Sequence, residues 1–129
     1  MVKCQWLIFN MRENIIKIKS FGFAIRVVKL FQFLQADKKE YILSKQLIRS
    51  GTSIGSNVEE ATNAPTKKDF AHMLSIALKE AHETRYWILL LKDTSYATAE
   101  EIAVILAEIT EIIAILTAIL KTSRISIDS

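Results

Sequence analysis

Very few side chains in this sequence are of the types that bind metals. The two histidines, His72 and His82, do not follow a glutamate by three residues, which is the spacing that di-iron helical bundles use. Asp69 and His72 have that spacing, but one such pair cannot complete a metal site. We therefore expect both histidines at the surface, and we expect neither a metal nor a cofactor.

Nucleophiles and acid–base pairs are equally scarce. The single cysteine, Cys4, lies in a stretch that we expect outside the folded unit. Glu59 with Glu60, or Glu80 with Glu83, could pair for acid–base work, although glutamates on helices are usually solvated. An enzyme would use Glu80, Glu83 and Asn57. The sequence contains no glycine-rich phosphate loop, nucleophile elbow or His-Glu-x-x-His motif. The prediction is a protein that is not an enzyme and has no small-molecule substrate.

The segment from Gln46 to Ala61 departs most from an ordinary helix. Two of the three glycines in the chain, Gly51 and Gly55, lie four residues apart inside its helical pattern. A glycine costs about 1 kcal/mol relative to alanine within a helix, so a compensating contact is needed. Gly51 falls on the apolar stripe, where a missing side chain lets another helix approach closely. We expect Gly51 and Gly55 at a helix crossing.

A polar stripe follows the same segment at the spacing of a helical bundle. Buried polar groups at such positions often set the register between helices. We expect this role here, in a network that reaches the third helix. The predicted members are Gln46, Ser53, Asn57, Glu60, Glu80 and Glu83, with Ser50 on the same stripe. The alternative is an anion site, for which the candidates are Arg49, Ser50, Thr52 and Ser53.

Four helical segments must position these residues. Their apolar side chains recur at intervals of three and four, as the core-facing stripe of a helix requires. The segments are expected at residues 14–34, 38–62, 66–92 and 98–120. The expected core-facing residues of the first are Phe21, Ile25, Val28 and Phe31. Those of the second are Leu43, Leu47, Gly51, Ile54, Val58 and Ala61, and those of the fourth are Ile102, Ile105, Ile109, Ile112, Leu116 and Ile119.

Capping residues mark the starts of the last two helices. Thr66 is followed three residues later by Asp69, and Thr98 by Glu101, which is the spacing of a capping box. Pro65 separates the second helix from the third because proline cannot continue a helix.

Composition favours a helical fold over the other classes. Half of the 129 residues are hydrophobic and the net charge is only +3, which excludes disorder. Three glycines and one proline are too few for the turns of an all-β fold. A lone cysteine excludes a disulfide framework and indicates a reducing, cytoplasmic location. The predicted fold is all-α: an antiparallel up-and-down four-helix bundle at residues 12–122, with a poorly ordered extension at 1–11 and a tail at 123–129.

The fourth helix is apolar enough to raise the question of a membrane. A carboxylate at the centre of a bilayer costs about 2.5–3.5 kcal/mol, and Glu108 and Glu111 lie near the middle of this segment. We therefore expect a buried bundle helix and no membrane association.

The apolar surface of that helix is also wider than one stripe. A helix of this kind must bury a second side, so we expect a homo-oligomer, with exposed β-branched surface as the alternative. The residues expected at the interface are Leu106, Ile113, Ile115 and Leu120.

Charge is unevenly distributed along the chain. Residues 1–62 carry ten Lys or Arg against five acids, whereas residues 63–129 carry seven against nine. A basic half of this kind is compatible with binding to RNA or DNA phosphates. The expected contacts are Lys38, Lys39, Lys45, Arg49, Lys67 and Lys68. The alternative is a structural or protein-docking module without nucleic-acid binding.

The block from residue 44 to residue 87 resembles the 23S rRNA-intervening-sequence protein family, also called four helix bundle protein. The resemblance rests on residues 44–50, 53–61, 67–70, 74–81 and 83–87. Two departures stand out: Glu59-Glu60-Ala61 replaces the usual Ala-Glu-Gly, and the basic excess is mild.

The resemblance implies a bacterial protein with an antiparallel four-helix bundle. Structurally related proteins form pentameric rings, so a pentamer is the implied assembly. A relative of the same fold, the accessory protein of diversity-generating retroelements, binds nucleic acid through a basic pentameric surface. RNA or DNA binding is thus an expectation from the family.

Overall fold

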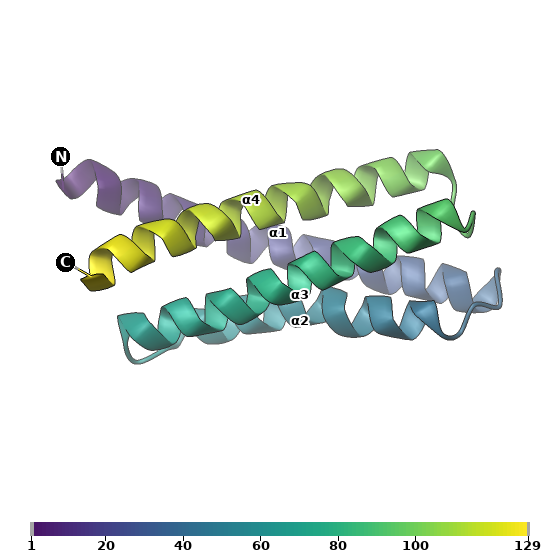
Figure 1. The fold of residues 1–129 in the computed structure, drawn as a ribbon, viewed down its shortest axis with the longest axis horizontal. Helices are drawn as coiled ribbons and strands as arrows, with labels where there is room; N and C mark the ends of the chain where they lie inside the picture. The colour runs from purple at the N-terminus through teal and green to yellow at the C-terminus, as the bar shows by residue number, and fades with distance from the viewer. Residues whose placement is uncertain (1, 129) are drawn as a thin grey trace.

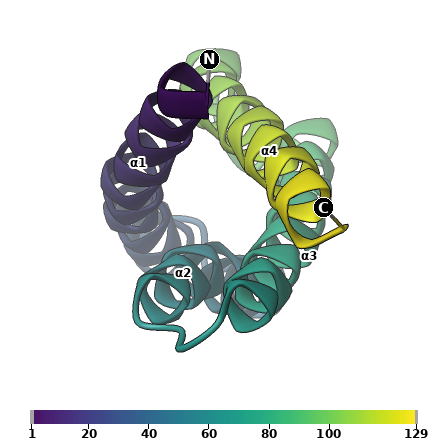
Figure 2. The same cartoon turned by 90° about the vertical axis from the view of Figure 1, so that its left-hand side faces the viewer.

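Four long α-helices, and no strand, make up the part of the chain that the structure describes. This computed structural model covers the backbone of residues 2–128 and the side chains of residues 10–123. The helices are α1 (Val2–Ala36), α2 (Leu43–Thr62), α3 (Lys67–Asp93) and α4 (Ala99–Asp128). Each helix packs against two neighbours, in the cyclic order α1, α2, α3, α4, and consecutive helices run antiparallel (Figures 1 and 2). The predicted all-α fold is confirmed.

The core contains the apolar stripes expected on α2 and α4. All six stripe residues of α4, from Ile102 to Ile119, are at most 2% exposed. On α2, Leu47, Ile54 and Val58 are equally buried, whereas Leu43 is half-buried at the start of the helix. Burying an aliphatic side chain of this size contributes roughly 1.5–3 kcal/mol. The periodicity of these two helices was therefore a sound guide to their inner faces.

The prediction for α1 selected the wrong face. Phe21 is 69% exposed and Ile25 is 45% exposed, and the other two expected core residues are only half-buried. The core-facing residues of α1 are Ile16, Ser20, Phe23, Val27 and Leu34, each at most 1% exposed. Because α1 has apolar side chains at helical spacing on two faces, periodicity alone could not distinguish the inner face from the outer one.

The two glycines of α2 lie where α1 crosses it, as predicted. A Cβ added at Gly51 would lie 2.9 Å from both methyl carbons of Val27. A Cβ added at Gly55 would lie 3.4 Å from the backbone oxygen of Ser20, which is an ordinary contact. Gly51 therefore permits a helix approach that any side chain would obstruct.

Both predicted capping residues form hydrogen bonds at the starts of their helices. The backbone N–H of Asp69 donates to Oγ1 of Thr66 over 3.0 Å. The Thr98 and Glu101 pair is reciprocal: the Glu101 N–H donates to Thr98 Oγ1 (3.2 Å), and the Thr98 N–H donates to Glu101 Oε2 (3.3 Å). These bonds satisfy N–H groups that a helix start leaves without partners.

The helices at both ends of the chain are longer than predicted. α1 begins at Val2, so the backbone of most of the extension expected at 1–11 is helical. α4 continues to Asp128 through the tail expected at 123–129. No proline interrupts either stretch, and the helical patterns of α1 and α4 extend without a stop signal.

The apolar surface of α4 packs largely against its own chain. Leu120, expected at an oligomer interface, is 5% exposed, and the three other residues expected there are half-buried against the core. By length and hydropathy the stretch Ala99–Ser123 could cross a membrane, but within the bundle Glu111 and Glu108 form ion pairs with Lys19 and Arg26 of α1. The assignment of these four residues to an oligomer interface stays a prediction.

Candidate functional site

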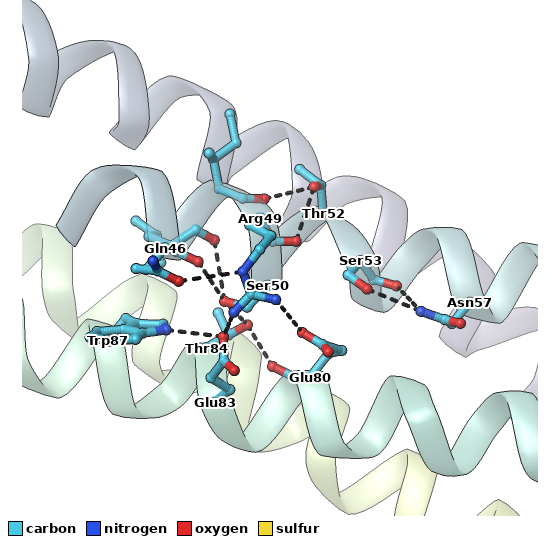
Figure 3. A network of polar contacts seen from close by, with 12 residues as sticks. Gln46, Arg49, Ser50, Thr52, Ser53, Asn57, Glu80, Glu83, Thr84 and Trp87 are labelled. Atoms are coloured by element: carbon cyan, nitrogen blue, oxygen red, sulfur yellow. Dashed lines mark hydrogen bonds and ion pairs between the residues drawn. The ribbon is translucent and has the colours of Figure 1, made fainter. Parts of the chain in front are cut away.

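A cluster of polar side chains joins α2 to α3 at mid-length (Figure 3). Arg49 of α2 reaches two glutamates of α3, with Nη1 lying 3.4 Å from Glu80 Oε2 and Nη2 bonded to Glu83. Its Nε donates to Gln46 Oε1 over 3.4 Å, and Trp87 Nε1 donates to Glu83 Oε2 over 3.2 Å. The guanidinium is therefore occupied by carboxylates of its own chain.

Beneath Arg49, two hydroxyl groups meet in the core. Thr84 Oγ1 lies 2.9 Å from Ser50 Oγ, and neither residue is exposed. Each hydroxyl also reaches a carbonyl of its own helix: Ser50 that of Gln46 at 3.0 Å, and Thr84 that of Glu80 at 2.7 Å. The contact between the two buried hydroxyls favours one register between the helices, because a shift would break it and leave only the bonds within each helix.

The rest of the predicted polar stripe does not join this cluster. Asn57 Nδ2 donates to the carbonyl (2.8 Å) and the hydroxyl (3.0 Å) of Ser53, so this pair is local to α2. Glu60 is exposed, and within the described residues its carboxylate belongs to neither group. The single network that we predicted is therefore two separate groups, with Glu60 outside both.

The alternative anion site is not assembled. The Thr52 hydroxyl donates to the carbonyl of Ile48 over 2.6 Å, and Ser50 is fully buried. Arg49 is paired with glutamates, which would repel an anion. These groups do not converge on a common space that a phosphate could enter.

The six basic residues expected to bind nucleic acid do not form one face. Lys38 and Lys39 lie between α1 and α2, and Lys45 lies in the first turn of α2, whereas Lys67 and Lys68 begin α3 at the opposite end of the bundle (Figure 1). α2 has 20 residues, so about 30 Å separates the two groups. Arg49 lies between them and is paired.

The first of these groups surrounds exposed apolar side chains. Tyr41 is 49% exposed and Ile42 is 77% exposed, and both lie between Lys39 and Lys45 in the chain. Lys38 Nζ lies 5.8 Å from the centre of the Phe33 ring. We call Lys38, Lys39, Tyr41, Ile42 and Lys45 the basic corner.

Glu40 holds the basic corner in shape. Its carboxylate accepts hydrogen bonds from the backbone N–H groups of Ile42 (2.9 Å), Leu43 (2.8 Å) and Ser44 (2.7 Å), and its own N–H donates to the carbonyl of Leu34. Burial alone would raise the pKa of Glu40, but these backbone N–H bonds outweigh burial and hold the pKa below its ordinary value. The anchored turn leaves neighbouring side chains pointing into solvent.

The sequence analysis did not predict several residues of these polar groups. Thr84 and Trp87 follow Glu80 and Glu83 at helical spacing, so the same face of α3 could have indicated them. Glu40 was missed because we placed the start of the second helix at residue 38, whereas α2 begins at Leu43. An acidic residue just before a helix start is a capping signal.

The candidates for catalysis do not come together. His72 and His82 are exposed. Glu80 and Glu83 pair with Arg49, whereas the Asn57 amide donates to Ser53 of its own helix. Within the described side chains, no three His, Cys, Asp or Glu residues are grouped closely enough to hold a metal ion. Cys4 lies outside the side chains that the structure describes.

Both the sequence and the fold match those of known proteins. The sequence profile of a family described as 23S rRNA-intervening sequence protein matches residues 12–118. A crystal structure of a protein with unknown function from the S23 ribosomal protein family of Bacteroides thetaiotaomicron VPI-5482 superposes with a TM-score of 0.83. The two chains are 48% identical over 85% of this chain and 98% of that one. None of the curated proteins is detectably similar to the chain.

Proposed function

Because the chain belongs to the 23S rRNA-intervening sequence protein family, we propose that it is a non-enzymatic bundle protein that self-associates and binds RNA or DNA through its basic corner. We place the protein in the bacterial cytoplasm. The proposed assembly is a ring, and the expected number of copies is five.

The observation that supports nucleic-acid binding is the make-up of the basic corner. Three exposed lysines can neutralise phosphates, and release of the counterions held by those phosphates provides affinity without sequence specificity. The half-exposed ring of Tyr41 lies among them and offers a surface on which an unpaired base can stack. Proteins that bind single-stranded nucleic acids combine basic side chains with exposed aromatic rings in this way. Repetition of this corner around a ring would multiply the contacts on one strand.

The observation that supports self-association is apolar surface that the monomer leaves in water. Ile18 and Phe21 are 73% and 69% exposed, and both belong to the middle of α1. Exposed apolar patches of this kind usually mark protein interfaces. The molar mass from light scattering after size exclusion tests this part directly, because a ring would have several times the 14.7 kDa of one chain. A monomer at micromolar concentration would contradict it.

A salt titration of binding tests the basic corner. The triple variant Lys38→Gln, Lys39→Gln, Lys45→Gln should bind a labelled single-stranded RNA at least tenfold more weakly at low salt. Its slope of log K against log salt should be shallower by about 2, since each phosphate contact on a single strand contributes about 0.7. The matched control is Lys67→Gln, Lys68→Gln, Lys79→Gln, which removes the same charge at the other end of the bundle and along α3.

The control decides between a local site and general charge attraction. Equal losses in the two triple variants would mean that net charge, not the basic corner, determines binding. Tyr41→Ala should weaken single-stranded RNA binding by about tenfold and duplex binding much less, because only an unpaired base can stack on the ring. If the wild-type protein binds neither RNA nor DNA at low salt, nucleic-acid binding is wrong, and the protein is a structural or docking module.

A further inference from the structure

The outer face of α1 carries a continuous apolar stripe. Its residues recur at intervals of three and four and therefore share one side of the helix. Ile18, Phe21 and Ile25 are the most central, at 73%, 69% and 45% exposed. Met11 (60%) and Ile15 (39%) extend the stripe toward the N-terminus. Phe21 and Ile25 are the two residues of this stripe that the sequence analysis assigned to the core, and the described bundle leaves them exposed.

The outer face of α4 carries a stripe of a different shape. Six of its exposed positions recur at intervals of three and four and carry small side chains, while Val104 is exposed beside them. The six are Ala99, Ala103, Ala107, Thr110, Ala114 and Thr117. The hydroxyls of Thr110 and Thr117 donate to the carbonyls of Leu106 (2.8 Å) and Ile113 (2.7 Å). A shallow surface of this kind can accept large side chains from another helix, since small residues allow helix axes to approach closely.

Charge determines which of these surfaces can meet in an assembly. Lys19 and Arg26 of α1 already pair with Glu111 and Glu108 of α4 within one chain. Apart from these pairs, α1 keeps three basic side chains and one acidic one within residues 11–36, and α4 keeps two glutamates and one lysine within residues 99–123. Pairing α1 with α1 of a second copy would bring two basic helices together. Pairing α1 with α4 of a second copy would bring opposite charges and complementary shapes together. In the end view, α1 and α4 are neighbours, and each has an outer side that no other helix of the chain covers (Figure 2).

We propose that α1 of one copy packs its apolar stripe against the small-residue stripe of α4 of the next copy. Because the two surfaces differ, the contact is head-to-tail instead of isologous, and it produces a ring when the rotation between neighbouring copies closes. The occupant of the α1 stripe is therefore a second copy of this chain. This interface rests on the proposed self-association and specifies which surfaces produce it.

The ion pairs within one chain provide the expected register. Lys19 pairs with Glu111 and Arg26 with Glu108, so these residues lie at matching heights on antiparallel α1 and α4. In a ring whose axis runs along the helices, neighbouring copies meet at the same heights. Ile18 then faces Ala114 of the next copy, and Ile25 faces Ala107.

Disulfide crosslinking tests this contact in the full chain. On a Cys4→Ser background, Ile18→Cys and Ala114→Cys are made as separate proteins, and light scattering first gives the mass of each. Mixed and oxidised, the two proteins should form a crosslinked dimer, whereas neither should do so alone. A chain carrying both substitutions should give a ladder that ends at the number of copies in the ring. Ala103→Cys is the matched control, because it lies 11 residues from Ala114, about 16 Å along the helix and beyond disulfide reach.

Each outcome distinguishes this interface from self-association itself. Efficient dimers of Ile18→Cys alone would show α1 against α1 and overturn the proposal. An oligomer in which Ile18→Cys crosslinks equally well to both α4 positions, or to neither, would also overturn it but leave self-association standing. A monomeric mass would overturn both. A Phe21→Glu chain should be monomeric at 14.7 kDa with unchanged helical circular dichroism, and an intact oligomer in that variant would contradict the proposal.

Discussion

The neighbours of α1, namely α2 and α4, are held in the bundle by different means. α4 contributes seven aliphatic side chains to the core, and its polar contacts with α1 are ion pairs at the surface. α2 contributes fewer large side chains and relies on shape and hydrogen bonds instead. Gly51 lies against Val27 on one side, and Ser50 meets Thr84 on the other.

The difference separates stability from specificity. Aliphatic burial is favourable in any register that keeps the stripe inside, so α4 supplies free energy without demanding one exact position. A glycine contact or a buried hydroxyl pair is satisfied in one arrangement only. α2 therefore determines how the helices are aligned, and α4 determines much of how strongly they associate. Two surface grooves of about 420 and 240 Å³ lie between α1 and α4, so side chains fill the contact between these two helices incompletely.

The largest effect should come from truncating the apolar stripe of α4. Ile109 is fully buried at its centre, and Ile109→Ala should lower the free energy of unfolding by about 3 kcal/mol, since it removes apolar contacts and leaves a cavity. Ile109→Leu keeps the volume and should cost less than about 1.5 kcal/mol. Urea unfolding at one fixed protein concentration measures both. Equal losses would mean that α4 also depends on exact shape.

The glycines test whether α2 depends on shape. Gly51→Ala should destabilise the protein by about 1 kcal/mol, because the clash with Val27 outweighs the gain in helix propensity. Gly22 is the matched control: nothing lies within 4 Å of a Cβ added there, so Gly22→Ala should stabilise the protein by about 1 kcal/mol. Stabilisation by both substitutions, in urea titrations, would remove the argument for a close crossing at Gly51.

The buried hydroxyl pair tests whether α2 depends on hydrogen bonds. Thr84→Val keeps the shape of the side chain and should cost about 1 kcal/mol, because Ser50 loses its partner on α3. A double-mutant cycle with Ser50→Ala should give a coupling energy above about 0.5 kcal/mol. Additive effects of the two substitutions in that cycle would show that the contact does not link the helices.

The cap of α2 predicts a dependence on pH. The pKa of Glu40 is lower in the folded protein than its ordinary value, so the unfolded chain binds more protons at acidic pH. Its stabilisation is therefore complete above the unfolded pKa of about 4.3 and is lost as the pH falls through the lower folded pKa. Glu40→Gln should cost about 1 kcal/mol at pH 7 and progressively less as acid is added. Parallel urea titrations from pH 7 to pH 3 should converge, and a constant difference would contradict the capping role.

The smallest effect should come from the ion pairs between α1 and α4. Lys19 and Glu111 are both well exposed, and such pairs contribute less than about 1 kcal/mol because water and salt screen them. Lys19→Gln should change the free energy of unfolding by less than about 0.5 kcal/mol, with no dependence on salt above 0.5 M. A larger loss would mean that the contact between α1 and α4 is as specific as the contacts that α2 makes with α1 and α3.

Most of the fold was predictable because its signals are local. The caps at Thr66 and Thr98, and the stripe from Ile102 to Ile119, depend on residues a few positions apart in the chain. The glycine pair could be recognised because it contradicts helix propensity and therefore requires a neighbour. The candidate site was less predictable. Its basic residues were identified by type, but their distances follow from helix lengths and turns.

What the sequence by itself determined is the number of helices, their caps and the presence of a close crossing on α2. The tertiary structure alone decided which face of α1 is buried. That face includes Ser20 and Val27 because they fit against Gly55 and Gly51, whereas the equally periodic stripe of Ile18, Phe21 and Ile25 has no such counterpart. It also decided that Arg49 is paired with glutamates while three lysines gather at the basic corner. The physical reason is that periodicity encodes a face but not its partner, and partners are set by packing between segments far apart in the chain.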